Sequence, residues 1–253
     1  MSHLHIPDGV LPLWLAGSGW LLLAILLLLA LRRMGKEDRG RRLPLLGVMS
    51  AVMLIGMSTE IVPIAYHTNL SVLAGIVLGP ALGLVAAFIV NLMLALFGHG
   101  GITVVGLNAL VLGFEAALGH YLFRGVWSLL SRRQRSPAIA AGIATVLALL
   151  ASSSLMVAIV GLSNLDPASS VVGHVESLGF RNPFEHGLVS QELLSPQAGH
   201  EEEGEAAGRM DLFSFARLVL LLGVAGWALE GVLIGAIVGF VHRVRSDLVI
   251  EGK

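Results

Sequence analysis

Long apolar segments alternate with short polar ones along most of the chain. Five of them are long enough to cross a bilayer, since about 20 helical residues span a hydrocarbon core about 30 Å thick. These five segments are Leu13–Leu31, Pro44–Ile64, Ile102–Phe123, Ala138–Gly161 and Leu212–Val241. We expect each to form a transmembrane helix.

A sixth apolar segment, Leu70–Phe97, is interrupted by Gly79 and Pro80. Proline lacks a backbone donor and favours a turn or the start of a new helix. Two shorter helices are therefore predicted here, which brings the expected total to seven. The predicted fold is an all-α integral membrane bundle in which residues 1–253 form a single domain.

Basic residues indicate how this bundle is oriented. They gather in three polar stretches: Arg32, Arg33, Lys36, Arg39, Arg41 and Arg42 in the first, Arg124, Arg132, Arg133 and Arg135 in the second, and Arg243, Arg245 and Lys253 in the tail. Lysine and arginine concentrate on the cytoplasmic side of membrane proteins. We therefore expect a cytoplasmic C-terminus and, with seven helices, an N-terminus outside the cell inner membrane.

The same orientation gathers several polar segments on the outer face. They are residues 1–12, the turns around His67 and His99, and the segment 163–211. Segment 163–211 carries nine acidic residues against two arginines and is rich in Gly, Ser and Pro, so it is predicted to be an acidic extracytoplasmic loop. The start of the chain has no basic region and no cleavage site before its apolar run, so we expect it to be retained.

Composition supports a membrane protein and excludes several chemistries. The chain is 55% hydrophobic and 13% charged, with a net charge of −1 and no cysteine. Without cysteine, the possible metal ligands are His, Met and carboxylates. No phosphate-binding glycine loop, His-Glu-x-x-His pair or Gly-x-Ser-x-Gly elbow occurs, so the sequence offers no motif for splitting ATP or for hydrolysis.

Four histidines lie at the predicted outer end of the bundle: His3, His5, His67 and His99. Taken singly, each is typical of a polar residue that ends a helix at the interface. Together they indicate a metal site, since imidazole suits Ni, Co, Zn and Cu(II). His120 and His242 fall near predicted cytoplasmic helix ends, and His174, His186 and His200 lie in the acidic loop; we interpret these five as structural or solvated.

The amino terminus has coordination chemistry of its own. A free amine, a deprotonated backbone nitrogen and a histidine in second or third position form a rigid chelate that favours square-planar Ni(II) or Cu(II). Removal of Met1 would leave Ser2-His3 as such a chelate, and retention of Met1 would leave the longer Met1-Ser2-His3 form.

Polar residues within the apolar segments need partners or a wet cavity. Glu60 lies close enough to His67 in sequence to belong to its site, whereas Glu115 and Glu230 fit either internal packing or a partner surface. Asn91 and Asn108 are expected to form hydrogen bonds across helices. Met49, Met53 and Met57 recur every fourth residue, which favours packing between helices over a path for Cu(I).

Several short strings occur in a fixed order along the chain. They are His5-Ile6-Pro7-Asp8-Gly9, His67 thirteen residues before Pro80, Gly100-Gly101-Ile102-Thr103, Gly106-Leu107-Asn108, and a last helix containing Glu230. With this set the chain resembles, nearly end to end, the CbiM/NikM type of cobalt/nickel permease. That family is the substrate-specific S component of energy-coupling-factor transporters.

The resemblance implies a seven-helix subunit that binds one Ni(II) or Co(II) ion for ATP-driven uptake. Its ligands would be the terminal amine, a backbone nitrogen, the first histidine and a histidine after the second helix, a role that falls to His67. A transmembrane coupling subunit and cytoplasmic ATPase subunits are the implied partners, so the resemblance implies a transporter subunit with no cofactor and no enzyme activity of its own. Glu60, His99 and Asn108 are candidates to support the ligands.

Two features depart from the family pattern. Family members typically begin Met-His-Ile-Pro-Asp-Gly, whereas residues precede the alignable His5 here, and the acidic loop is longer than usual. Alignment therefore selects His5 as the first histidine ligand, whereas the chelate chemistry of a Ser2-His3 start selects His3, which we place first.

Two other functions are considered beside transport. One is a membrane-embedded metalloenzyme with zinc held by His67, His99 and Glu60, because catalytic zinc commonly has three protein ligands and an open position. The other is a scaffold subunit that binds no metal. Metal-dependent turnover would favour the first, and an absence of bound nickel or cobalt in equilibrium dialysis would favour the second.

The predicted orientation is testable by cysteine labelling, because the chain has no native cysteine. A single cysteine at Ala198, in the acidic loop, should react with a membrane-impermeant maleimide added outside the cell. If Ala198→Cys reacted only after the cytoplasmic side of the membrane became accessible to the reagent, the predicted orientation would be wrong.

Overall fold

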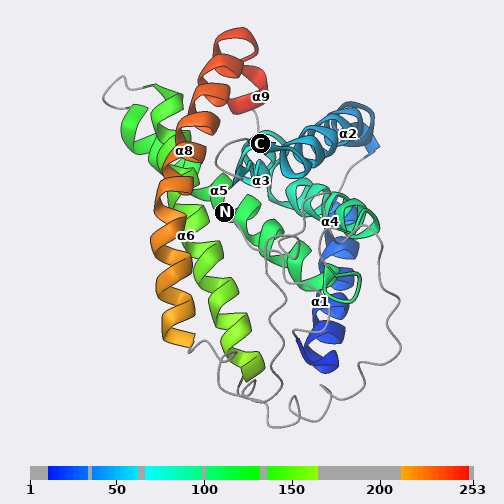
Figure 1. Cartoon of the computed structure of the whole chain (residues 1–253). Coiled ribbons are helices and arrows are strands. Elements are labelled where there is room, and N and C mark those ends of the chain that lie inside the picture. Colours follow the sequence, from blue (N-terminus) through cyan, green and yellow to red (C-terminus); the bar gives the residue numbers. More distant parts are fainter. Residues whose placement is uncertain are drawn as a thin grey trace, which may run out of the picture.

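The computed structural model describes residues 11–33, 36–61, 66–98, 101–131, 136–164 and 212–250, and this part of the chain is mostly helical (Figure 1). Its elements, in order, are α1 (Leu13–Arg33), α2 (Lys36–Ser58), β1 (Glu60–Ile61), β2 (Tyr66–His67), α3 (Ser71–Leu78), α4 (Pro80–Leu96), α5 (Val105–Ser131), α6 (Pro137–Asn164), α8 (Leu212–Val244) and α9 (Asp247–Ile250). Seven of the described helices have eight residues or more, which confirms the predicted helical membrane architecture.

Four described helices are long and apolar enough to cross a membrane. Their apolar spans are Leu13–Arg32, Val105–Leu130, Pro137–Ile159 and Gly223–Val244, in α1, α5, α6 and α8. The apolar parts of α2 and α4 are shorter, Arg42–Ser58 and Pro80–Leu96. The predicted full-length span Pro44–Ile64 is therefore wrong at both ends.

Helix α2 begins before its predicted start and ends before its predicted end. Lys36 and the basic residues that follow lie in the helix rather than in a loop, because lysine and arginine are good helix formers. Pro44 lies inside this helix and removes one of its backbone hydrogen bonds. The helix ends at Ser58 and the chain continues into β1. Pro63 disfavours continuation of the helix to its predicted end at Ile64, because the residue before a proline avoids helical backbone. Glu60 consequently lies in a strand, not inside an apolar helix.

The predicted break between two short helices is confirmed. Gly79 has φ 83°, a value that favours glycine, and it separates α3 from α4. Pro80 occupies the first turn of α4, where its missing N–H has no helical partner to lose.

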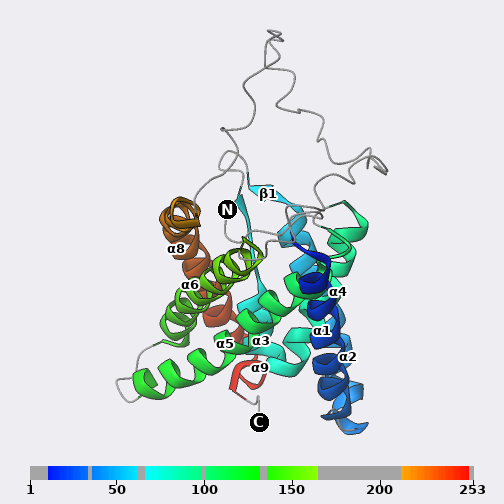
Figure 2. The same cartoon turned by 90° about the horizontal axis from the view of Figure 1, so that it is seen from below.

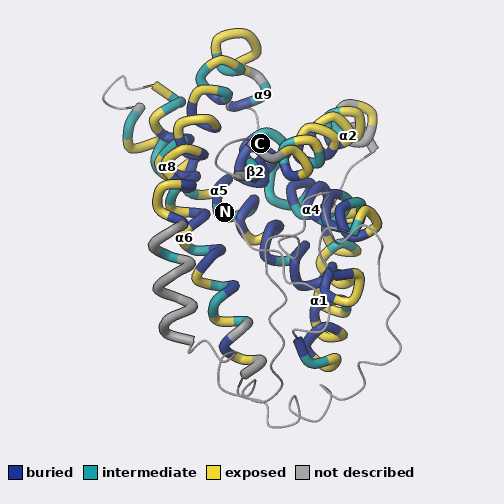
Figure 3. The backbone as a smooth tube through the Cα atoms, in the orientation of Figure 1, coloured by how far each residue is buried: buried dark blue, intermediate teal, exposed yellow. Residues whose placement is uncertain are grey.

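The short helix α3 lies at the centre of the bundle, and all of its residues except Val77 are buried. The largest buried cluster takes in residues of α2, α3, α4, α5, α6 and α8. The buried sides of the helices face inward and exposed positions line the outside of α1 and α2 (Figure 3). Exposed apolar side chains such as Leu21 and Ile55 suit a surface in contact with lipid.

Helices α3 and α5 touch backbone to backbone. A Cβ atom added at Gly75 would lie 1.9 Å from the carbonyl oxygen of Ala116. His120 adds a polar contact, with its Nδ1 3.0 Å from the carbonyl oxygen of Gly75. His120 is therefore buried within α5 instead of near a helix end, which corrects the prediction from sequence.

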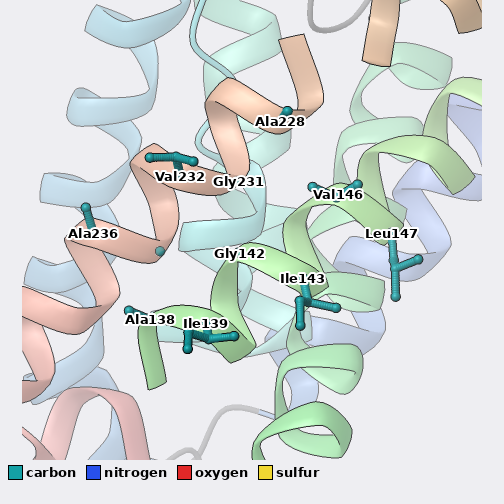
Figure 4. A pocket seen from close by; sticks show the side chains of 11 residues that line it. Ala138, Ile139, Gly142, Ile143, Val146, Leu147, Ala228, Gly231, Val232 and Ala236 are labelled. Carbon is teal, nitrogen blue, oxygen red and sulfur yellow. The ribbon is translucent and has the colours of Figure 1, made fainter. Parts of the chain in front are cut away.

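Helices α6 and α8 lie side by side (Figure 1) and approach each other through glycines. A Cβ at Gly142 would lie 2.9 Å from the carbonyl oxygen of Gly231, and one at Gly235 would lie 2.7 Å from that of Ala138. Small residues let membrane helices pack closely. An apolar groove of about 580 Å³ runs along this contact, and Figure 4 shows side chains from both helices that line it.

Replacement of Gly75 by alanine tests the backbone contact at the centre of the bundle. We expect Gly75→Ala to lower the free energy of unfolding by about 1–3 kcal/mol, because the new methyl group meets a backbone atom that a side-chain rotation cannot move. Thermal unfolding of the purified protein in detergent measures this.

Gly125→Ala is the matched control, since a Cβ at Gly125 in α5 meets nothing within 4 Å. It should be neutral or stabilising by up to about 1 kcal/mol, as alanine is the better helix former. Equal unfolding midpoints for Gly75→Ala and the native protein would contradict the tight contact.

Candidate metal site

The candidate ligand His67 lies in a two-stranded antiparallel hairpin that follows α2. In this hairpin Glu60 pairs with His67 and Ile61 with Tyr66. Glu60, which was expected to lie near His67 from sequence alone, is thus the residue directly across the strands from it. The hairpin lies at the end of α2 opposite to Lys36, and Figure 2 shows β1 at this end of the bundle.

The residue after His67 is fixed to the last turns of α2. The backbone N–H and the hydroxyl of Thr68 both donate to the carbonyl oxygen of Gly56, each at 3.2 Å. A Cβ at Gly56 would lie 2.7 Å from Thr68 Oγ1, so a glycine allows this close approach.

The next residues reach a buried carboxylate. Asn69 Nδ2 donates to Glu115 Oε1 at 2.6 Å, and Asn69 Oδ1 accepts the backbone N–H of Ser71 at 3.0 Å. The hydroxyl of Ser71 also donates to Glu115 Oε1. All three side chains are completely buried, so these hydrogen bonds are shielded from water.

A third element completes the surroundings of this carboxylate. Ser152 Oγ of α6 lies 2.7 Å from Glu115 Oε2 and 3.1 Å from the carbonyl oxygen of Leu149. Glu115 therefore joins the segment that follows His67 to both α5 and α6. Of the two roles considered from sequence for Glu115, internal packing is the one that this environment supports.

The sequence did not single out Asn69, Ser71 or Ser152. The available signal was Glu115 itself, because a carboxylate in an apolar helix requires hydrogen-bond donors nearby. Sequence alone does not identify those donors, because they are distant from Glu115 along the chain. Ser71 lies 44 residues before it and Ser152 lies 37 residues after it.

The predicted site residues fall partly within the described structure. His67 is half-buried in β2, and Asn108 is buried at the start of α5. Asn108 precedes Glu115 by seven residues, which places both on one face of α5. Ser2, His3, His5 and His99 lie outside the described residues. Across the described ranges, no three His, Asp or Glu residues come close enough together to hold a metal ion.

The remaining polar and sulfur-containing candidates have internal roles. Met49, Met53 and Met57 are all buried in the main cluster, which confirms the packing interpretation. Asn91 Nδ2 donates to the carbonyl oxygen of Ala87 in its own helix at 2.8 Å, so within the described part of the chain this bond is formed inside α4 and not across helices as expected. His242 lies in the last turn of α8, with its ring centroid 5.5 Å from that of Trp127.

Comparison with solved structures finds the same fold in metal transporters. A crystal structure of a transition metal transporter matches with a TM-score of 0.66 at 17% identity, covering 95% of this chain and 93% of that one. A truncated transition metal transporter matches with a TM-score of 0.61 at 18% identity, covering 96% and 99%. At these identities the likeness establishes the fold alone.

Relatives by sequence match over about half of the chain. A cobalt transport protein CbiM of Geobacter sulfurreducens is 33% identical over 131 residues, which cover 49% of this chain and 38% of that protein. A protein of Haloquadratum walsbyi whose name refers to metal transport is 36% identical over 126 residues, 48% of this chain and 58% of that one. The matched region thus spans between about two fifths and three fifths of these relatives.

A family model covers far more of the chain than any of these pairwise matches. The model, described as the cobalt uptake substrate-specific transmembrane region, matches residues 5–248. This range includes the hairpin with His67, the Glu115 network and every described helix long enough to cross a membrane. The chain therefore belongs to the CbiM family, which is described as the substrate-specific transmembrane region of cobalt uptake.

Proposed function

We propose that this chain is the S component of an energy-coupling-factor importer and captures Ni(II) or Co(II) on the outer face of the cell inner membrane. The position of His67 is the observation that carries the proposal. It lies in a hairpin at the end of α2 opposite to the basic residues Lys36 and Arg42. Basic ends face the cytoplasm, so the hairpin with its histidine faces outward.

The proposed ion site combines His67 with the start of the chain. Ser2 would supply the terminal amine, and His3 its backbone nitrogen and the first imidazole, which with His67 make four nitrogen ligands in the geometry that Ni(II) favours. His5 is the alternative first histidine. Glu60 is the nearest candidate to support His67, because the two are paired across the hairpin, and Asn108 and His99 are the other candidates.

Transport would require motion driven by other subunits. The chain has no phosphate-binding loop, so ATP hydrolysis is assigned to cytoplasmic ATPase subunits that act through a transmembrane coupling subunit. Membership in a family of uptake components supports this division of labour. Reorientation of the loaded subunit would then expose the ion to the cytoplasm without a continuous pore.

The alternative function, a membrane-embedded zinc enzyme, has less support than ion transport. The register of Glu60 with His67 brings two of its three proposed ligands together, but the CbiM family is a transport family. The scaffold function predicts no bound ion, so a binding measurement decides between it and the proposal.

Removal of the His67 imidazole tests the ion site. We expect His67→Ala to weaken nickel binding to the purified, metal-free protein by at least 100-fold, because it removes one of four nitrogen ligands and leaves the helices intact. Isothermal titration with nickel, and with cobalt in competition, measures the change. His3→Ala should weaken binding more than His5→Ala, and N-terminal sequencing should find Ser2 first.

His242→Ala is the matched control, because this histidine lies in the last turn of α8, far along the chain from the hairpin. Its nickel affinity should equal that of the native protein. Native affinity in His67→Ala would refute the proposed site, and native affinity in His3→Ala with loss in His5→Ala would transfer the first imidazole to His5.

Dependence on partner subunits is the second test of the proposed function. Liposomes that contain this chain alone should accumulate little nickel or cobalt, and accumulation should require added coupling and ATPase subunits together with ATP. Radioactive nickel uptake measures it. Rapid accumulation by the chain alone, without ATP, would indicate a channel or secondary carrier instead.

A further inference from the structure

We propose that Glu115 is a positioning residue for the ion site, acting through hydrogen bonds that hold the segment directly after His67. This inference rests on the proposed function, in which His67 binds the transported ion. The carboxyl group does not contact the ion in this role. It holds Asn69 and Ser71, and they fix where the chain leaves β2.

The orientation of the Asn69 amide makes an acceptor at position 115 necessary. Asn69 Oδ1 accepts the backbone N–H of Ser71, so its Nδ2 is turned away and must donate elsewhere. Glu115 Oε1 lies 2.6 Å from that nitrogen. Asn69 is completely buried, and a buried donor without an acceptor is costly.

The distance from Asn69 to His67 is short enough for this anchoring to matter. Two residues of fully extended chain span at most about 7 Å. Thr68, between them, is tied to Gly56 by its backbone and its hydroxyl. The backbone of His67 is therefore followed by two anchored residues, one bonded to α2 and one to α5.

Glu115 is itself held in a rigid setting. The next residue, Ala116, touches Gly75 of α3 backbone to backbone. Ser152 approaches the second carboxyl oxygen from α6. An acceptor fixed by three elements can transmit their rigidity to the segment that carries the ion ligand.

The donor and acceptor pattern indicates that position 115 needs an acceptor and not a negative charge. Ser152 has one hydroxyl hydrogen and two acceptors within reach, Glu115 Oε2 and the carbonyl oxygen of Leu149. A glutamine at 115 could accept from Asn69 and Ser71 through its oxygen and donate to Ser152, whose hydroxyl would then donate to Leu149. Leucine, of similar size, offers none of these bonds.

The experiment compares Glu115→Leu with Glu115→Gln in the purified, metal-free chain. We expect Glu115→Leu to weaken nickel binding by about 10–100-fold, the range found when groups behind a metal ligand are removed, and Glu115→Gln to recover most of that loss. Hydrogen exchange of residues 66–71, measured without metal, should rise in the leucine variant and return close to native rates in the glutamine variant. Titration with nickel alone gives the affinities.

Two further variants keep the test decisive. Asn69→Ala removes one donor and leaves Glu115 bonded to Ser71 and Ser152, so it should fold even where Glu115→Leu does not, and it should show the same two changes to a smaller extent. Thr145→Ala is the control, because this buried hydroxyl of α6 donates within its own helix, to Ala141, and both measurements should stay native.

The outcomes separate this inference from the proposed function. Native nickel affinity in folded Glu115→Leu and Asn69→Ala, with affinity lost in His67→Ala, would overturn the positioning role and leave the function standing. Equal losses in Glu115→Gln and Glu115→Leu would also overturn it, since the charge would then be what matters. Native affinity in His67→Ala would instead refute the proposed function.

Discussion

The backbone contact between Gly75 of α3 and Ala116 of α5 is the constraint on which the arrangement of the bundle depends. It leaves no room for a side chain at position 75, and it fixes an eight-residue helix that is too short to be stable alone. Around this contact, Glu115 bonds to Ser71 and His120 to Gly75. Helix α3 is thus ordered by α5, and the chain on either side of α3 takes its position from that contact.

The same contact links the membrane interior to the hairpin. From α3 the chain runs back through Asn69 and Thr68 to His67, and each step is tied to a different helix, Asn69 to α5 and Thr68 to α2. A polar network buried among apolar helices requires full satisfaction of its donors. Glu115 meets that requirement for three neutral donors, because its two carboxyl oxygens accept from Asn69, Ser71 and Ser152.

Much of the fold could be predicted from the sequence because bilayer thickness fixes the length of an apolar helix. The spans in α1, α5, α6 and α8 and the break at Gly79-Pro80 followed from that rule and from proline geometry. The end of α2 did not, because the polar residues Ser58, Thr59 and Glu60 are followed by apolar ones and were therefore placed inside the predicted span. The partners of Glu115 also escaped prediction, because contacts between distant segments leave no pattern in local hydrophobicity.

The candidate site shows the same division between local and distant information. His67 was identified from its place at the predicted outer end of the bundle and from the family resemblance, and its pairing with Glu60 depends on a hairpin that apolar periodicity does not reveal. On the proposed function, this hairpin brings one ion ligand that is already ordered by folding to meet ligands from the start of the chain. An ordered ligand lowers the conformational entropy lost on binding. The rigidity at Glu115 would then contribute to ion affinity even though the carboxylate never touches the ion.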